Sequence, residues 1–192
     1  MIETIRKEIL AGLLIGIGGF AFLSVDNKYI GAFLFSVGLI SVILLGASLY
    51  TGKVGYVRTI PNALRMIPMC LLNMVGASLV GIVTQPLVRD QAVVSVGNKL
   101  MKTPLNVFIS AVICGALIYL AVELYKRSRN ILTIIIPVFT FVAVGADHCI
   151  ANAYYFVAAG EFTRIPLLYL IVCVFGNAVG SLVVSLLQGE KS

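Results

Sequence analysis

Charged residues are scarce in this sequence of 192 residues, because Asp, Glu, Lys and Arg together make up only 11% of it. A soluble globular domain contains about 25% charged residues and about 45–50% apolar ones. Here 60% of the residues are hydrophobic, and the mean hydropathy is +1.05. No soluble fold could bury that many apolar side chains, so the composition predicts a protein whose solvent is the lipid bilayer.

Groups that bind metals or perform catalysis are equally rare. The chain has one histidine, His148, and no Cys-x-x-Cys pair among its four cysteines. A lone histidine without further ligands at suitable spacing does not make a metal site, and thiols inside apolar runs pack as small hydrophobic side chains. A membrane-embedded enzyme would need a second histidine or a carboxylate pair at mid-membrane depth. We therefore expect no metal, no cofactor and no enzymatic activity.

The net charge of +6 does not form a basic patch interleaved with stacking aromatics, so no nucleic-acid partner is expected. In a membrane protein, an excess of Lys and Arg marks the cytoplasmic side. With the N-terminus placed inside, nine fall on the cytoplasmic side and five on the other: Arg6, Lys7, Lys53, Arg58, Arg65, Lys126, Arg127, Arg129 and Lys191 against Lys28, Arg89, Lys99, Lys102 and Arg164. This bias predicts that both termini are cytoplasmic, in a cell membrane of the bacterial type.

Six apolar runs divide the chain, and each is long enough for a helix of about 20 residues that crosses a bilayer. They lie at about 9–25, 29–51, 63–87, 104–124, 131–160 and 165–187. The alternating polarity of a membrane β-barrel is absent, so the runs predict helices. No small-residue cleavage site follows the first run, which indicates a retained span rather than a signal peptide. The expected fold is a single all-α polytopic membrane domain over residues 1–192, with six transmembrane helices.

Two short patterns recur in the same order in the two halves of the chain. "NMVGASLV" at 73–80 and "NAVGSLVV" at 177–184 share Asn-x-Val-Gly, and "LLGASLYTG" at 44–52 and "AVGADHCIA" at 143–151 share Gly-Ala. The pattern predicts two repeats, at about 1–90 and 100–192. Each repeat has three spans, an odd number, so the second must cross the membrane in the inverted orientation, as in many transporters and channels.

The second and fifth runs are longer than one simple span, and each carries a Gly-Ala-polar interruption near its middle. Glycine-interrupted segments at corresponding positions of two halves mark the binding site in such folds. A helix that restarts there points its free N–H groups at the membrane midplane. We therefore expect the segments 46–52 and 145–152 to face one another across a pore.

At these residues the chain resembles the formate/nitrite transporter family, which includes hydrosulfide channels. "FSVGLISVILLGASLYTG" at 35–52 resembles the second helix of that family with its loop, and "ICGALIYLAV" at 113–122 resembles the fourth. "PVFTFVAVGADHCIAN" at 137–152 resembles the fifth helix, with the signature Glu-His-Ser-x-Ala-Asn written as Asp-His-Cys-Ile-Ala-Asn. The resemblance implies an aquaporin-like protomer with broken second and fifth helices, and a homopentamer in the lipid bilayer with one pore through each protomer.

The resemblance also implies site residues. The pore would contain the central histidine His148, the loop threonine Thr51, the mouth lysine Lys99 and the signature asparagine Asn152. Two apolar constrictions would be formed by Phe35, Leu39, Leu49 and Phe141, and the helix breaks would be supported by Asp147, Gly46, Gly145 and Gly52. The sequence departs from the family at Gly115, where an asparagine is common and a pore-wall donor would be lost, and at Lys53, where an asparagine is usual.

Each of these residues also has a plainer interpretation. His148 could be a core histidine, and Thr51 could satisfy backbone groups at the break. The four constriction residues could be ordinary core packing. Lys99 lies in "VGNKLMKTPL", read as a loop between the halves, where a lysine is usually solvated; with Lys102 one turn away it could instead attract anions. Asp147 is expected to hold the break in shape rather than to act chemically.

These features predict a channel or transporter for small monovalent anions or their conjugate weak acids, of the formate, nitrite or hydrosulfide class. Carrying a bare anion through an apolar neck is expensive, whereas a neutral weak acid avoids most of that cost. The imidazole of His148, with an ordinary pKa of about 6.5, is suited to this chemistry. The alternative is an aquaporin-like pore for neutral small solutes, although the paired Asn-Pro-Ala breaks of such pores are absent.

Overall fold

The computed structural model describes residues 2–189, so Lys191, counted above on the cytoplasmic side, lies outside the described residues. All regular structure in this part of the chain is helical, as the apolar runs without alternating polarity predicted. The elements are α1 (Ile2–Leu23), α2 (Lys28–Leu44), α3 (Tyr50–Lys53), the 3₁₀ turn η1 (Val54–Tyr56), α4 (Ile60–Leu100), α5 (Pro104–Ser128), α6 (Leu132–Ala143), α7 (Cys149–Ala159) and α8 (Arg164–Gln188).

Three of the described helices, α4, α5 and α8, are long and apolar enough to cross a membrane by length and composition. Their ends follow local rules. The hydroxyl of Thr103 caps the start of α5 by accepting from the Asn106 N–H at 3.3 Å, Pro104 occupies its first position, and Arg129 ends it in the left-handed conformation.

Helix α4 is longer than its apolar run at 63–87, because it continues to Leu100. The interpretation of Lys99 as a loop residue is therefore wrong: Lys99 lies in the last turn of α4. Hydropathy finds the part of a helix that touches lipid, whereas the helix itself continues through polar residues beyond it. Two prolines interrupt the hydrogen-bond ladder of α4, and Val88 (φ −136°, ψ 16°), two residues after Pro86, marks a kink.

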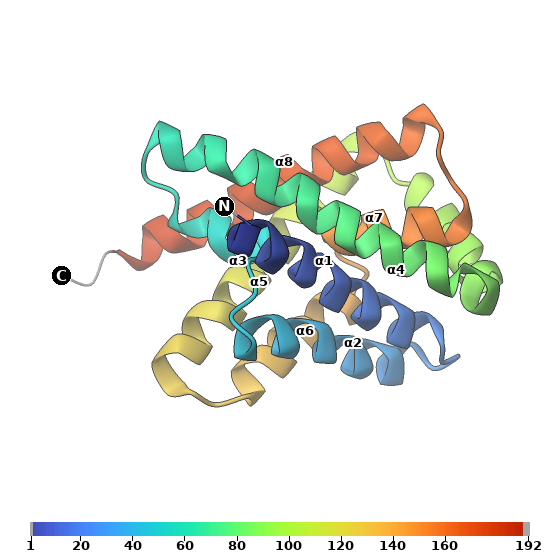
Figure 1. Cartoon of the computed structure of the whole chain (residues 1–192), viewed down its shortest axis with the longest axis horizontal. Coiled ribbons are helices and arrows are strands. Elements are labelled where there is room, and N and C mark those ends of the chain that lie inside the picture. Colours follow the sequence, from blue (N-terminus) through green and yellow to red (C-terminus); the bar gives the residue numbers. More distant parts are fainter. Residues whose placement is uncertain (1, 190–192) are drawn as a thin grey trace.

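The helices form two similar groups. Helix α1 packs between α2 and α4, and α5 packs between α6 and α8 (Figure 1). The short segments connect the groups crosswise, because α7 packs on α4 and α1 whereas α3 and η1 pack on α5 and α8. The two segments predicted from the sequence to form the binding site, 46–52 and 145–152, are thereby held against the opposite half of the molecule.

Close backbone approach defines the crossings within each group. A Cβ atom on Gly12 of α1 would overlap the carbonyl oxygen of Asn73 in α4, and one on Gly180 of α8 would overlap the carbonyl oxygen of Val112 in α5. Gly115 lies at the second crossing, where a Cβ atom would overlap the carbonyl oxygen of Asn177. The expectation that glycine at position 115 removes a side-chain hydrogen-bond donor from the pore wall is therefore wrong, since this position has no room for a side chain.

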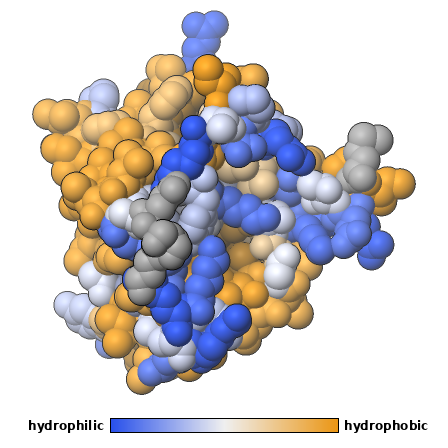
Figure 2. Space-filling model, turned by 90° about the vertical axis from the view of Figure 1, so that its left-hand side faces the viewer, coloured by the Kyte–Doolittle hydropathy of each residue, from blue (hydrophilic) through white to orange (hydrophobic). Residues whose placement is uncertain are grey.

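The outer surface is apolar along the helices. Large side chains that are more than half exposed include Val83 on α4 and Leu187 on α8, at 75% and 84%. Figure 2 looks at one end of the molecule and shows hydrophilic residues gathered toward the middle of that face, with hydrophobic residues around them. This distribution is typical of a membrane protein with a polar interior and a lipid-facing rim.

The glycine crossings give a direct stability prediction. Gly180→Ala should lower the free energy of unfolding by about 1–3 kcal/mol, because the added methyl group has no space against α5. Gly97→Ala is the matched control, since nothing lies within 4 Å of a Cβ atom there, and Ala in place of Gly stabilises a helix by about 0.5–1 kcal/mol. Thermal unfolding of the detergent-solubilised protein measures both. Equal melting temperatures for the two variants would contradict this packing.

Candidate functional site

Two short non-helical segments, 45–49 and 144–148, join α2 to α3 and α6 to α7, and the same turn opens each. Gly46 and Gly145 have φ of +63° and +72°, the left-handed conformation that favours glycine. After Gly46, the N–H of Ala47 donates to Val42 O at 2.9 Å, and after Gly145 the N–H of Ala146 donates to Phe141 O at 2.8 Å. This pattern is a Schellman turn, which ends α2 and α6 with their last carbonyls satisfied.

A buried asparagine holds the first segment in place. The Asn73 side chain on α4 is 0% exposed, and its Oδ1 accepts from the Tyr50 N–H at 2.7 Å, the first N–H of α3. Its Nδ2 donates to Ser48 O at 2.9 Å and to Glu8 O at 2.6 Å. One amide side chain therefore satisfies three backbone groups from three different elements.

Asn177 on α8 makes the equivalent contacts with the second segment. Its Oδ1 accepts from the Cys149 N–H at 2.9 Å, the first N–H of α7. Its Nδ2 donates to Asp147 O and to Ala111 O, both at 2.8 Å. Sequence reasoning did not assign these two asparagines a role, although the repeated Asn-x-Val-Gly pattern that contains them was the available signal.

The segments meet at Thr51 and His148. Thr51 Oγ1 lies 2.8 Å from His148 Nε2, and both residues are buried, at 0% and 1% exposure. His148 is the N-cap of α7, where its Nδ1 accepts from the Ala151 N–H at 3.1 Å. A neutral imidazole with an accepting Nδ1 carries its proton on Nε2, so His148 donates to Thr51 and the hydroxyl proton of Thr51 is left to donate elsewhere.

Asp147 is at the centre of a buried hydrogen-bond cluster. Its side chain is 0% exposed and forms ion pairs with Lys99 at 2.8 Å and Lys102 at 2.6 Å. It also accepts from Tyr169 Oη at 2.7 Å and from Ser110 Oγ at 2.8 Å. A buried carboxylate needs such partners. Lys99 is therefore neither a solvated loop lysine nor a free cation at a pore mouth, because its charge is paired with Asp147.

Lys102 connects this cluster to the turn beside it. Besides its bond to Asp147, its Nζ donates to Gly145 O at 3.0 Å. Asn152 joins from α7, with Nδ2 donating to Asp147 Oδ1 at 3.3 Å. The carboxylate fixes the orientation of the amide, which leaves Asn152 Oδ1 as a buried acceptor without a hydrogen-bond partner among the described residues.

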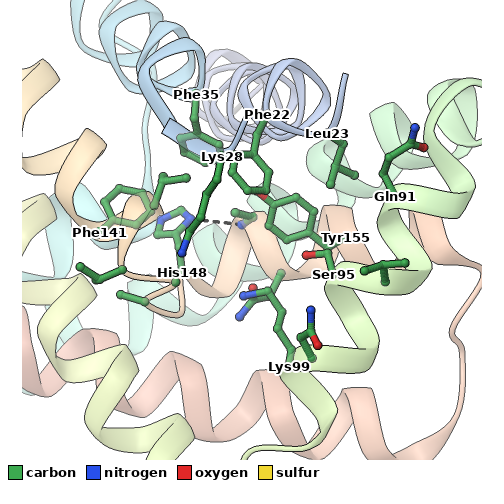
Figure 3. Close-up of a pocket in the computed structure, with 18 of the residues that line it drawn as sticks. Phe22, Leu23, Lys28, Phe35, Gln91, Ser95, Lys99, Phe141, His148 and Tyr155 are labelled. Carbon is green, nitrogen blue, oxygen red and sulfur yellow. Dashed lines mark hydrogen bonds between the residues drawn. The ribbon is translucent and has the colours of Figure 1, made fainter. Parts of the chain in front are cut away.

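A cavity of about 680 Å³, named the Lys99 cavity here, lies on the His148 side of the segments. Phe35, Phe141, His148 and Asn152 all line it. Figure 3 shows Phe35, Phe141 and His148 on one side of this cavity and Tyr155, Ser95 and Lys99 across from them. The rings of Phe35 and Phe141 pack edge to face with centroids 5.6 Å apart, and Phe141 lies 6.0 Å from the imidazole.

A second cavity of about 690 Å³, named the Lys53 cavity, is lined by Lys53 together with Leu39, Leu49 and Gly52. Leu49 and Gly52 flank Thr51 closely in the chain, whereas His148 lines the Lys99 cavity. The Thr51–His148 hydrogen bond therefore links His148, which lines the Lys99 cavity, to a residue whose chain neighbours line the Lys53 cavity. The four apolar residues expected at constrictions divide into one pair in each cavity.

Comparison with known proteins supports one family. The sequence model described as "Formate/nitrite transporter" matches residues 1–189. The uncharacterized transporter YrhG of Bacillus subtilis is 35% identical over 182 residues, covering 82% of this chain and 68% of that protein. The formate channel FocA of Haemophilus influenzae is 24% identical over 149 residues, covering 67% of this chain and about half, 52%, of that relative.

Solved structures of the same fold exist. A pentameric formate channel with formate bound superposes with a TM-score of 0.86 at 21% identity, covering 97% of this chain and 95% of that one. An ion channel of the FNT family gives a TM-score of 0.86 at 19% identity, covering 97% of this chain and 88% of the other. At these identities the comparison establishes the shared fold.

The asparagine contacts lead to a second stability prediction. Asn177→Ala should lower the melting temperature of the solubilised protein strongly, because each buried backbone group left without a partner costs about 1–3 kcal/mol. Asn73→Ala should act similarly on the other segment. Asn106→Ala, at an exposed position of α5, is the control and should leave the melting temperature unchanged. If Asn177→Ala and Asn106→Ala had the same melting temperature, Asn177 would not hold the segment 144–148 in place.

Proposed function

We propose that this chain, which belongs to the formate/nitrite transporter family, passes small monovalent anions or their conjugate weak acids across a membrane. The formate, nitrite and hydrosulfide class fits a pore of this kind. The observation that carries the proposal is the buried Thr51–His148 hydrogen bond of 2.8 Å, with Phe35 and Phe141 lining the cavity on one side and Leu39 and Leu49 lining the other cavity. We expect this chain to transport its substrate rather than to catalyse a reaction, and to need no cofactor.

The pore would run from the Lys53 cavity past Leu39 and Leu49, along the Thr51–His148 pair, and past Phe35 and Phe141 into the Lys99 cavity. An anion alone would lose most of its hydration between these side chains, at a cost of several kcal/mol. A permeant that takes a proton crosses as a neutral acid and largely avoids this cost. Ions such as chloride, which cannot be neutralised in this way, would be excluded.

His148 would act as a fixed neutral donor. Its Nδ1 accepts the Ala151 N–H at the start of α7, so a second proton on the ring would remove the cap of that helix. With its Nε2 proton directed at Thr51, the histidine orients the threonine hydroxyl so that the hydroxyl proton can be donated to a permeant oxygen or sulfur. Asn152 Oδ1, which has no partner in the described part of the chain, would accept from a protonated permeant.

The architecture proposed for this pore is an aquaporin-like inverted repeat. In it the six spans are α1, α2 with α3, α4, α5, α6 with α7, and α8, and the second and fifth are broken. The equivalent contacts of Asn73 and Asn177, and the matching turns at Gly46 and Gly145, support repeats at about 1–90 and 100–192. We also propose a homopentamer in the cell membrane, with both termini cytoplasmic.

Flux in proteoliposomes tests the substrate class. Vesicles that contain the protein should take up formate, nitrite or hydrosulfide faster than empty vesicles, and the rate should rise as pH falls from 8 to 5, because the neutral acid becomes more abundant. Osmotic swelling in glycerol serves as the comparison for a neutral-solute pore. Swelling without anion flux would favour that alternative, and the absence of both would refute the channel.

The Thr51 hydroxyl gives a sharper prediction. Thr51→Val keeps the shape of the side chain and removes the donor, and it should lower formate flux by about two- to tenfold, since a hydrogen bond between neutral groups contributes about 0.5–1.5 kcal/mol. Thr140→Val is the control, because that hydroxyl bonds only to its own helix at Ile136 O. Size-exclusion profiles should match for both variants. Wild-type flux in Thr51→Val would remove this hydroxyl from the mechanism.

A further inference from the structure

The two cavities differ in their charge. The Lys99 cavity is lined by Lys28, Lys99 and Lys102 and by Asp26 and Asp90. Asp147 neutralises one further charge, because it pairs with both Lys99 and Lys102. With three cations and three carboxylates, the described groups around this cavity have no net charge. It therefore does not attract anions in the way that the two lysines suggested from sequence.

The Lys53 cavity carries an excess of positive charge. Lys53, Arg65, Lys126 and Arg129 line it, and Glu8 is the one carboxylate among its lining residues, which leaves three positive charges in excess. Within residues 2–189, no ion pair joins any of these four cations to a carboxylate. Like charges around one concave space repel one another, and an anion that binds there would relieve the repulsion.

Glu123, which follows the lining residue Val122, has its carboxylate engaged by other partners. Glu123 pairs with Arg127 at 2.8 Å and accepts from Tyr56 Oη at 2.7 Å. Lys126 is held over the ring of Tyr56, with Nζ 3.7 Å from its centroid. This cation–π contact positions the ammonium group at the cavity wall, and Glu123 contributes only a longer-range attraction to its charge. The arrangement keeps a cation at the cavity wall with no ion pair to a carboxylate in the described part of the chain.

Lys53 is held equally firmly at the other side of the cavity. Its Nζ donates to Ser48 Oγ at 3.0 Å, and Ser48 lies in the segment 45–49 with 6% exposure. Because Ser48 accepts from Lys53, its own hydroxyl proton is free to be donated. The cavity thus presents fixed ammonium groups and a hydroxyl donor next to the apolar residues Leu39 and Leu49.

We infer that the Lys53 cavity binds a multivalent oxyanion of the phosphate or pyrophosphate type. Such an ion can interact with several of the four cations at once, whereas a monovalent anion neutralises one of the three excess charges. The cavity volume of about 690 Å³ accommodates it. Leu39 and Leu49 prevent it from passing, since a multivalent ion cannot be made neutral by one proton. A bound oxyanion therefore blocks the pore, and this consequence rests on the proposed channel function, whereas the binding itself does not.

Calorimetric titration of the solubilised oligomer with inorganic pyrophosphate tests the site. Pyrophosphate should bind at low ionic strength, and Lys53→Gln and Arg129→Asn should each weaken binding by about fivefold, the effect of one lost charge at 5–10 Å. Asn suits position 129 because Arg129 has φ +55°. Arg164→Gln removes an equal charge from α8 outside both cavities and should leave the affinity unchanged. No binding, or equal weakening by Arg164→Gln, would overturn the site.

Sided flux assays test the block. In membrane vesicles that expose the Lys53 cavity, pyrophosphate in the bath should inhibit formate uptake, and Lys53→Gln should shift the inhibition to about fivefold higher pyrophosphate. Vesicles of the opposite orientation should be insensitive. Uninhibited wild-type flux in both orientations would overturn the block. If wild-type vesicles showed no formate flux, the proposed function would fail, and the calorimetric result would still decide whether the site exists.

Discussion

The structure depends on two buried asparagines that replace missing backbone partners. Wherever a helix is interrupted inside an apolar protein, its free N–H and C=O groups must find hydrogen bonds, because the lipid provides none. Asn73 and Asn177 each supply one acceptor and two donated bonds to such groups. With those groups satisfied, the chain can leave the helix at 45–49 and 144–148, and Thr51 and His148 come within 2.8 Å of one another.

The glycines three residues after these asparagines contribute to the same arrangement. Gly76 and Gly180 permit α4 and α8 to approach α1 and α5 so closely that a methyl group would overlap a backbone carbonyl. That approach places Glu8 O and Ala111 O within reach of the amide nitrogens. The repeated Asn-x-Val-Gly pattern therefore contributes both to a tight helix crossing and to the hydrogen bonds that hold a non-helical segment.

Much of this could be predicted from the sequence. Composition predicted a helical membrane protein, and the Gly-Ala pairs predicted where the turns at Gly46 and Gly145 would fall, because both signals are local. Long-range polar contacts could not be predicted: the pairing of Lys99 with Asp147 joins residues 48 positions apart, and the packing role of Gly115 depends on the path of α8. Hydropathy also cannot show that α4 continues past its apolar run to Leu100 and so includes Lys99, because the added turns are more polar.

The proposed pore places the Thr51–His148 pair on the path of a small anion or its conjugate acid. A cryo-EM map of the oligomer in lipid, recorded with saturating formate, tests it most directly. We expect density for the permeant within hydrogen-bonding distance of Thr51 Oγ1, with His148 Nδ1 still facing the Ala151 N–H. Permeant density confined to another route, with the Thr51–His148 pair sealed from both cavities, would contradict it.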